Sequence, residues 1–189
     1  MPGDRYKPAS IGSDLRALRR TRKMTLQAVA EALGRSVGWL SQVERDISSP
    51  SITELRRFAA LYGVPISLFF GTADAPADEA GRVVRQGARR VISDPGVGLH
   101  EELLSPDLGD DFEVVRCTFA PHAAQRTPLQ RQTSEIVHLV SGRLIVWLDE
   151  QRFAIGTGDS IRIRGEKLRW ENPDDTAAVA IWVISPPIY

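Results

Sequence analysis

The stretch TLQAVAEALGRSVGWLSQVER, residues 25–45, predicts two short helices joined by a tight turn. Thr25 is expected to cap the first helix, and Gly34 to end it, because glycine adopts the left-handed conformation without steric cost. Ser36 is expected to cap the second helix. The expected inward residues recur at helical spacing: Leu26, Val29, Ala30 and Leu33 in the first helix and Leu40, Val43 and Ile47 in the second. Such a pair is typical of motifs that place their second helix in the DNA major groove, although a corner of an ordinary helical bundle has the same pattern.

Helices are also predicted on both sides of this pair. The preceding segment SDLRALRRTRK is amphipathic, with Ile11, Leu15 and Leu18 expected inward. In the following segment Ser51 and Glu54 have the spacing of a capping box. Its expected apolar stripe consists of Ile52, Leu55, Phe58, Ala59 and Tyr62. Gly63 ends that helix, and Pro65 predicts the start of a short fifth helix.

The charge of the chain is unevenly distributed. The whole sequence has 24 basic and 24 acidic residues, a balance that by itself argues against a nucleic-acid partner. The first 73 residues, however, hold 11 basic and 6 acidic side chains, a net charge of +5, and the remainder has a net charge of −5. Positive potential is therefore concentrated on the helical part, as expected for binding to a phosphate backbone.

Residues 15–69 resemble the Cro/C1 (xenobiotic response element) type of helix-turn-helix, a five-helix DNA-binding domain that is lambda-repressor-like. The run SVGWLSQVERDISSPSITELRRFAALYGV follows the family pattern almost position by position. The resemblance implies a structural pair between Arg19 and Glu44. Asp46 stands where the family usually has glycine, and because aspartate tolerates the left-handed conformation better than most residues, the turn is expected to survive. The resemblance also implies DNA contacts from Thr25, Gln27, Arg35, Ser36, Val37, Gly38, Trp39, Ser41, Gln42, Arg45 and Ser48.

The sequence changes character after the helical part. We expect the DNA-binding domain over residues 1–70 and a linker over 71–81, where GTADAPADEAG is small, acidic and turn-prone. From residue 82 to 189, short β-branched runs such as RVVR, FEVVRCTF and RLIVWL alternate with turn residues. This pattern predicts a sandwich or small barrel, with a hairpin at Ser141-Gly142 and a turn at Gly156 to Asp159. The single cysteine, Cys117, lies in an apolar strand and is expected to be a buried thiol.

The segment SEIVHLVSGRLIVWLDEQRFAIGTGDSIRIRGEKLRWENP resembles the two motifs of a cupin, the RmlC-like double-stranded β-helix. Glu135 through Gly142 match the end of the first motif. The second motif is matched by Gly158, Asp159, Asn172 and Pro173. The predicted fold class is therefore two-domain α+β, with an all-β cupin domain for effector sensing and dimerisation after the helical domain.

Metal-binding cupins place three histidines around the glutamate that corresponds to Glu135. Those positions are Leu129, Arg131 and Leu168 in this chain, and His138 has the opposite strand parity to Glu135. One carboxylate among four ligand positions does not hold a transition metal against water. We therefore expect no metal and no other cofactor.

The barrel interior is then a candidate effector pocket. Arg131 and Glu135 are expected to face the same side, where they would read the carboxylate and ammonium of a zwitterion; alternatively, they pair with each other. Trp147 and Trp182 either line the same cavity or belong to the core. The family resemblance implies an amino acid, a polyamine or a related metabolite as the effector.

The sequence as a whole predicts a cytoplasmic, non-enzymatic transcriptional regulator without a membrane segment or signal peptide. We expect a homodimer on inverted operator half-sites in double-stranded DNA, with an effector that alters the placement of its DNA-binding domains. Two alternatives stay open. One is a cupin enzyme, an isomerase or dioxygenase, with an attached DNA-binding domain, and the other is a constitutive DNA-binding protein whose cupin only dimerises.

Overall fold

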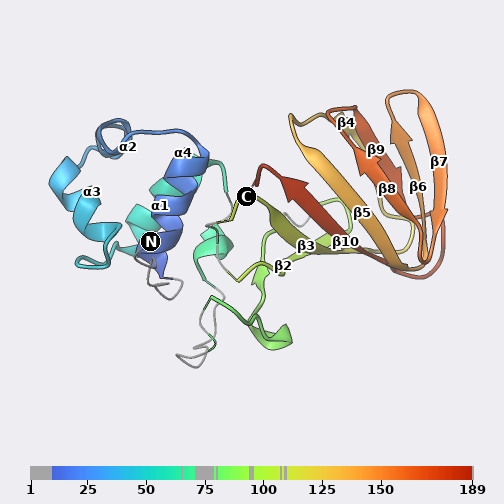
Figure 1. Cartoon of the computed structure of the whole chain (residues 1–189), viewed down its shortest axis with the longest axis horizontal. Helices are drawn as coiled ribbons and strands as arrows, with labels where there is room; N and C mark the ends of the chain where they lie inside the picture. The colour runs from blue at the N-terminus through green and yellow to red at the C-terminus, as the bar shows by residue number, and fades with distance from the viewer. Residues whose placement is uncertain are drawn as a thin grey trace, which may run out of the picture. The chain divides into compact units, whose positions relative to one another are not determined.

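The computed structural model describes residues 10–64, 66–70, 79, 81–93, 96–106, 108 and 110–188 (Figure 1). The chain divides into two compact units. The first contains the described residues up to Arg90 together with those of Ser105–Asp110, and the second contains those of Val91–Leu104 and Asp111–Ile188. The predicted linker, residues 71–81, lies outside the described residues except for Glu79 and Gly81. The domain limits 1–70 and 82–189 stay a prediction.

Four α-helices form the first unit: α1 (Ile11–Thr21), α2 (Leu26–Leu33), α3 (Val37–Val43) and α4 (Ile52–Tyr62). Side-chain caps begin α2 and α3, because Thr25 Oγ1 accepts a hydrogen bond from Ala28 N and Ser36 Oγ accepts one from Trp39 N, both at 3.1 Å. Ser51 and Glu54 form the capping box of α4. Gly34 ends α2 with φ +62°.

The core of this unit contains most of the apolar residues predicted to face inward. Its fully buried members include Leu15, Leu18, Val29, Leu40, Val43, Phe58 and Tyr62. Ile47 and Ile52, however, are 63% and 62% exposed, so their predicted inward positions were wrong. The reason is that α3 ends at Val43 and Asp46 takes a left-handed conformation (φ +59°), so helical spacing no longer applies at Ile47. Ile52 is the first residue of α4, before the buried stripe starts at Leu55.

The predicted fifth helix is a single 3-10 turn, η1 (Ile66–Phe69). Four residues are too few to close more than one turn of hydrogen bonds, and the cost of nucleating a helix is not repaid over that length. Leu68 and Phe69 are nevertheless buried, so the turn contributes to the core as the fifth helix was expected to do. None of the helices among the described residues is long and apolar enough to cross a membrane.

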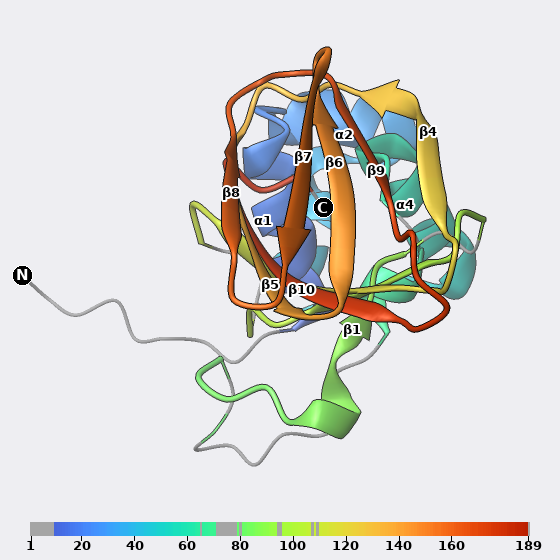
Figure 2. The same cartoon turned by 90° about the vertical axis from the view of Figure 1, so that its right-hand side faces the viewer.

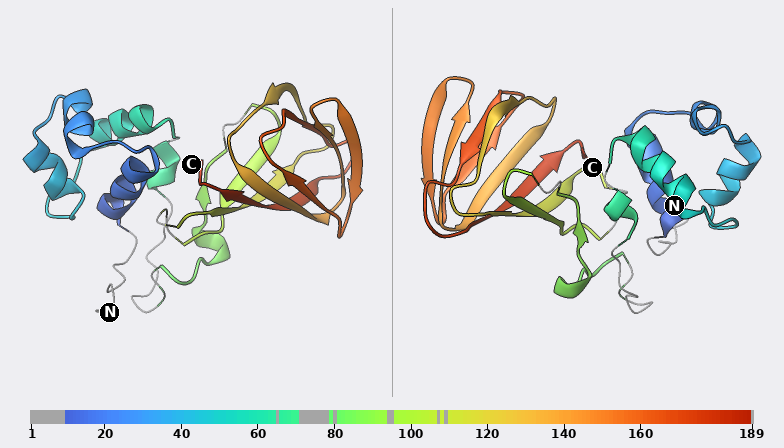
Figure 3. Two further views of the ribbon diagram at one scale, coloured as in Figure 1. Left: turned by 45° about the horizontal axis from the view of Figure 1, so that its top comes forward. Right: turned by 180° about the vertical axis from the view of Figure 1, so that it is seen from behind.

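Two antiparallel sheets form the second unit (Figure 2). The six-stranded sheet has the order β1-β2-β3-β10-β5-β8, and the four-stranded sheet has the order β4-β9-β6-β7. Figure 3 shows the curved strands from two further directions. The strands are β1 (Arg90–Val91), β2 (Leu99–Leu103), β3 (Glu113–Phe119), β4 (Ala124–Leu129), β5 (Ser134–Ser141), β6 (Arg143–Leu148), β7 (Gln151–Gly156), β8 (Ser160–Ile163), β9 (Leu168–Glu171) and β10 (Ala178–Ser185).

One connection and one strand that the sequence predicted after residue 81 were wrong. Ser141-Gly142 does not form a hairpin, because β5 pairs with β10 and β8 whereas β6 pairs with β7 and β9. Gly142 (φ +83°) instead carries the chain from one sheet to the other. The RVVR run at residues 82–85 is not a strand and precedes a 3-10 turn, η2 (Gln86–Ala88). The Gly156 to Asp159 turn was predicted correctly, since Asp159 N donates to Gly156 O at 2.9 Å.

The core of the second unit lies between the inner faces of its sheets. β3, β5 and β10 alternate between buried and more exposed residues, which is the pattern of sheets with one covered face. Phe119 packs edge-on against Trp170, with ring centroids 4.7 Å apart, and lies 6.5 Å from the ring of Trp182. The buried Asn172 amide donates to three backbone carbonyls, including Phe119 O at 3.2 Å, so this motif residue fixes loops of the barrel.

Candidate nucleic-acid interface and barrel interior

The predicted DNA-contacting residues surround the exposed side of α3. Ser36, the N-cap of α3, is exposed, and so are Gly38 and Gln42 within the helix. Thr25, Gln27, Arg35 and Arg45 are also exposed, and Val37, Ser41 and Ser48 are half-buried. Because Leu40 and Val43 are fully buried on the opposite side, α3 presents a polar surface of small residues and one amide. Such a surface suits the close approach of a helix to base edges.

Trp39 differs from its neighbours on α3 because it is part of the domain's packing. Its ring stacks on Phe58 of α4 at a centroid distance of 6.2 Å and an interplanar angle of 16°. The Arg35 guanidinium covers the indole, 5.2 Å from its centroid, and Arg35 Nη2 bonds to Glu54 Oε1 at 2.6 Å. The hydrogen bond from the Ser51 backbone, with a smaller effect from Arg35, lowers the pKa of Glu54. Trp39 and Arg35 therefore hold α3 against α4.

Gln42 has its side-chain amide oriented by Ser48, whose Oγ donates to Gln42 Oε1 at 3.2 Å. Arg45, one turn beyond Ser41, donates from Nε to Ser41 O at 3.0 Å. With Oε1 already accepting one bond, Gln42 presents its NH₂ group as the freer end. The segment after α3 thus positions the amide that was predicted to read a base.

The end of α3 is attached to α1 by a buried ion pair. Arg19 Nε and Nη2 donate to the two carboxylate oxygens of Glu44 at 2.6 and 2.9 Å, and Arg19 Nη1 donates to Met24 O at 3.0 Å. The Arg19 and Glu44 side chains are only 12% and 5% exposed. The hydrogen bond with Glu44 raises the pKa of Arg19. The structure therefore contains the pair that the family resemblance implied.

Asp46 supplies a second attachment that the sequence did not reveal. Its carboxylate accepts from Ser10 Oγ at 2.6 Å and from Gly12 N at 3.0 Å, at the start of α1. Asp46 was expected only to tolerate a left-handed turn in place of glycine. Its φ of +59° agrees with that expectation, and the two hydrogen bonds give the carboxylate a structural role.

Glu135 lies inside the barrel, where its carboxylate is already bonded. Thr133 Oγ1 donates to Glu135 Oε1, and Trp182 Nε1 donates to Oε2 at 2.5 Å. Glu135 and Trp182 are 2% and 7% exposed. Within the described part of the chain Arg131 forms no hydrogen bond or ion pair with Glu135, so the alternative that these two side chains pair with each other was wrong.

Trp147 does not line the barrel interior. On β6 it pairs with Arg152 of β7 and Arg169 of β9, whereas the neighbouring Val146 pairs with the buried Trp170. Directly paired residues share a face, so Trp147 lies on the outer face, where Arg169 Cζ is 5.4 Å from its ring centroid. The prediction that it contacts an effector inside the barrel was wrong, because strand parity could be assigned only once the partners were known.

Two further glutamates, not singled out from the sequence, face the interior from β2 and β3. Glu113 is 1% exposed, and burial raises its pKa from 4.5 to about 7. Burial also raises the pKa of Glu101, against the opposing effect of Arg131. Cys117, 2% exposed, has Sγ 3.9 Å from Glu101 Oε1, and burial raises the pKa of its thiol. Glu113 lies between the apolar Phe112 and Val114, and Glu101 lies between two other polar residues, so neither position gave a sequence signal of a site.

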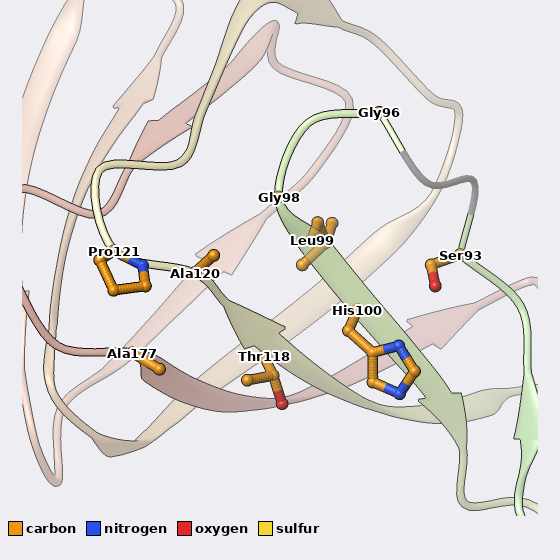
Figure 4. Close-up of a pocket in the computed structure, with 9 residues that line it drawn as sticks. All are labelled: Ser93, Gly96, Gly98, Leu99, His100, Thr118, Ala120, Pro121 and Ala177. Carbon is orange, nitrogen blue, oxygen red and sulfur yellow. The ribbon is translucent and has the colours of Figure 1, made fainter.

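A separate hollow of about 690 Å³ lies on the outer face of β2 and β3 (Figure 4). His100 and Thr118, which are paired across the two strands, line it together with Leu99, Pro121 and several glycine, alanine and serine residues. It contains none of the side chains predicted to bind an effector. We therefore keep the charged interior, and not this hollow, as the candidate effector site.

Comparison with known proteins agrees with both units. The protein family described as a helix-turn-helix domain matches residues 10–69, and the family described as a cupin domain matches residues 115–184. The HTH-type transcriptional regulator DdrOP3 of Deinococcus deserti is 32% identical over 93 residues, which is 49% of this chain and 70% of that protein. The HTH-type transcriptional regulator PuuR of Escherichia coli is 25% identical over 155 residues, 80% of this chain and 81% of that protein.

The chain belongs to the Cro/C1-type helix-turn-helix transcriptional regulators with a C-terminal cupin domain. It is therefore a DNA-binding regulator. Among solved structures, an HTH_3 family transcriptional regulator from Vibrio cholerae is 24% identical, with a TM-score of 0.45 and coverage of 94% of this chain and 95% of that chain.

The cupin domain of this regulator does not provide the ligand set of a metal centre. Leu129 and Leu168 have no donor atoms, Arg131 is cationic, and the Glu135 carboxylate is bonded to Thr133 and Trp182. Among the described residues there is no group of three or more histidine, cysteine, aspartate or glutamate side chains placed to hold a metal. The residues at the family's metal position therefore do not fit the ion.

Chelators are expected to leave the regulator unchanged. Because the metal position offers no suitable donor set, treatment with EDTA should shift neither its melting temperature nor its affinity for operator DNA. Elemental analysis of the purified protein provides the direct measurement. About one zinc, iron or nickel atom per chain would contradict this prediction.

Glu113 is expected to make the stability of the cupin domain depend on pH. With a pKa of about 7 in the folded state and 4.5 in the unfolded chain, its contribution to stability is full below about pH 4.5 and is lost as the pH rises through about 7. Glu113→Gln keeps an acceptor for Ile188 N but does not ionise. The stability of this variant relative to the parent should therefore increase by about 2 kcal/mol between about pH 5 and about pH 8, measured by urea unfolding. Parallel pH curves for the two proteins would refute this role.

Proposed function

We propose that this regulator binds inverted operator half-sites as a homodimer and that a small-molecule effector in its metal-free cupin domain changes its affinity for DNA. The observation that carries the DNA part is the exposed polar side of α3, whose C-terminal end is held to α1 by the contacts of Glu44 with Arg19 and of Asp46 with Gly12. A helix fixed in this way loses little freedom on binding, which favours recognition by a preformed surface.

Charge supports the same assignment. The net charge of +5 in the first 73 residues lies on the part of the chain that carries α3. Arg16, Arg20, Arg45, Arg56 and Arg57 are exposed. Affinity for DNA should therefore fall steeply as the salt concentration rises, because bound phosphates release their counterions.

DNA binding, assembly and effector response can be tested in one series. The full chain is used to enrich genomic fragments, and fluorescence anisotropy measures its affinity for the recovered operator against random DNA. Light scattering with and without operator gives the stoichiometry, where two chains per inverted repeat support the proposal and one chain contradicts the homodimer. A thermal-shift screen of metabolites, repeated with operator DNA, then tests the effector.

Gln42→Ala is expected to weaken operator binding by about 1 to 3 kcal/mol and binding to random DNA by much less, because the amide bonds to a base edge. Gln27→Ala is the matched control. Its exposed side chain at the start of α2 is expected to face phosphate, so its loss should weaken binding to both DNAs alike. Equal losses for Gln42→Ala on the two DNAs would show that Gln42 does not specify sequence.

We infer further that the protein acts in the cytoplasm and is not an enzyme, since its relatives are transcriptional regulators and the cupin metal position has no histidine beside its one carboxylate. If the protein is instead a constitutive regulator whose cupin domain only dimerises, no metabolite in the screen will change both its melting temperature and its affinity for operator DNA. Turnover of a small molecule by the isolated protein would instead support the enzyme alternative.

A further inference from the structure

Three glutamates point into the cupin barrel from one sheet. Glu113 of β3 and Glu135 of β5 flank Ile184 of β10 in the same row of paired residues. Glu101 of β2 is paired with Cys117 of β3, which lies on the same inner face as Glu113. Three carboxyl groups thus share an interior that is otherwise lined mainly by apolar and aromatic residues.

Only one of these carboxylates has both of its oxygens bonded to side chains. Glu135 is bonded by Thr133 and Trp182. Glu113 Oε1 accepts from the backbone N of Ile188 at 3.1 Å, but its Oε2 is buried and has no hydrogen-bond partner among the described residues. At 1% exposure, an oxygen without a partner is costly, and a ligand that donates a hydrogen bond would remove that cost.

The charges around Glu113 favour a positive ligand. The groups whose charges act on it are Glu101 from β2, Glu135 from β5 and Arg131 from the segment before β5. On the neighbouring strands, β10 contributes Ile184 and Trp182 and β8 contributes Ile163, none of which is charged. Three carboxyl groups therefore share this interior with the charge of one guanidinium, that of Arg131, which is an exposed residue.

We propose that Glu113 is the anchor of the effector site and binds the ammonium group of a small organic amine through Oε2. This inference deepens the proposed function and rests on it for the effect on DNA. It also revises the zwitterion hypothesis, since Glu135 is already bonded and Glu113 takes its place as the partner of the cation. Arg131 then acts as a competing positive charge at the site and not as the partner of a ligand carboxylate.

Binding of an amine by Glu113 has a defined proton balance. The ionised carboxylate accepts hydrogen bonds from the ammonium, so a proton held by Glu113 in the free protein is released to the buffer. With a pKa of about 7, affinity should rise by about tenfold from about pH 6 to about pH 8. A carboxylate ligand bonded to protonated Glu113 and Arg131 would show the opposite dependence.

The test is calorimetric titration of the full chain with n-butylammonium chloride, and with sodium n-butyrate as a probe of equal length and opposite charge. We expect butylammonium to bind and butyrate not to bind. Glu113→Gln should weaken butylammonium binding by about tenfold or more at about pH 8 and abolish its pH dependence. Glu102→Gln, which removes a carboxylate from the outer face of the same sheet, is the control and should leave binding within about twofold.

Arg131→Gln separates an amine site from a zwitterion site. Removing the competing charge should tighten butylammonium binding by about fivefold, whereas weaker binding would show that Arg131 supports the ligand. Binding of butyrate alone would overturn the proposal, and so would unchanged amine binding in a Glu113→Gln variant whose circular dichroism shows that it is folded. The proposed function is tested separately: if butylammonium binds through Glu113 but leaves operator affinity unchanged, the site stands and the coupling to DNA fails.

Discussion

Glu44→Ala is expected to lower the free energy of unfolding of the helical unit by about 3 kcal/mol, because it leaves the Arg19 guanidinium largely buried without its main partner. The loss exceeds that of an exposed ion pair, which is worth about 1 kcal/mol or less. It should also weaken operator binding, since the pair attaches the end of α3 to α1. Urea unfolding followed by the circular dichroism of the helices measures the change.

A double-mutant cycle distinguishes the pair from the separate side chains. Arg19→Ala leaves the buried Glu44 carboxylate unpaired, and the double variant removes both charges. We expect the double variant to be less destabilised than the sum of the two single variants by about 1 to 3 kcal/mol. Additive losses would mean that Arg19 and Glu44 contribute independently.

Gly12→Ala is expected to destabilise the helical unit by about 3 kcal/mol, although alanine is the better helix former by about 1 kcal/mol. A Cβ at position 12 of α1 would lie 2.3 Å from Val43 O and 2.6 Å from Asp46 Oδ1. The first of these atoms belongs to the backbone at the end of α3, so α1 and the end of α3 would have to separate. The same displacement would break the hydrogen bond from Gly12 N to Asp46.

Gly38→Ala is the matched control for this substitution. Gly38 is in the exposed face of α3, and the nearest atom to a Cβ there is Ser36 Oγ at 4.0 Å. Alanine at this position should therefore stabilise the unit by about 0.5 to 1 kcal/mol, while its methyl group obstructs DNA if Gly38 faces the major groove. A stable Gly12→Ala protein with full operator affinity would show that α1 and α3 are not held at this distance.

Local rules explain why the helical unit was largely predictable. A cap requires a side chain within three residues of the amide it accepts from, so Thr25, Ser36 and Ser51 could be assigned directly. The glycine that ends α2 is equally local, since its φ of +62° needs no distant partner. The prediction for Ile47 was wrong because it extended helical spacing beyond the point where the backbone turns at Asp46.

In the barrel, by contrast, connections and side-chain faces depend on which strands pair, and this could not be predicted from local sequence. Ser141-Gly142 has the composition of a hairpin turn, but β5 pairs with β10, about forty residues away, and the turn joins two sheets. Trp147 and Trp182 are both tryptophans in apolar strands, yet register places the first on the outer face and the second beside Glu135.

The sequence by itself determined the two-domain organisation, the caps of α2, α3 and α4, and the lack of histidines at the cupin metal position, because each depends on residue types at short spacing. Only the tertiary structure decided which carboxylate is available. Glu135 was the expected partner of a cation from its place in the motif, but Trp182 reaches it from a strand 47 residues away, whereas Glu113 keeps a buried oxygen without a partner among the described residues. Hydrogen bonding between distant strands depends on their register, and register is set by the packing of the whole sheet.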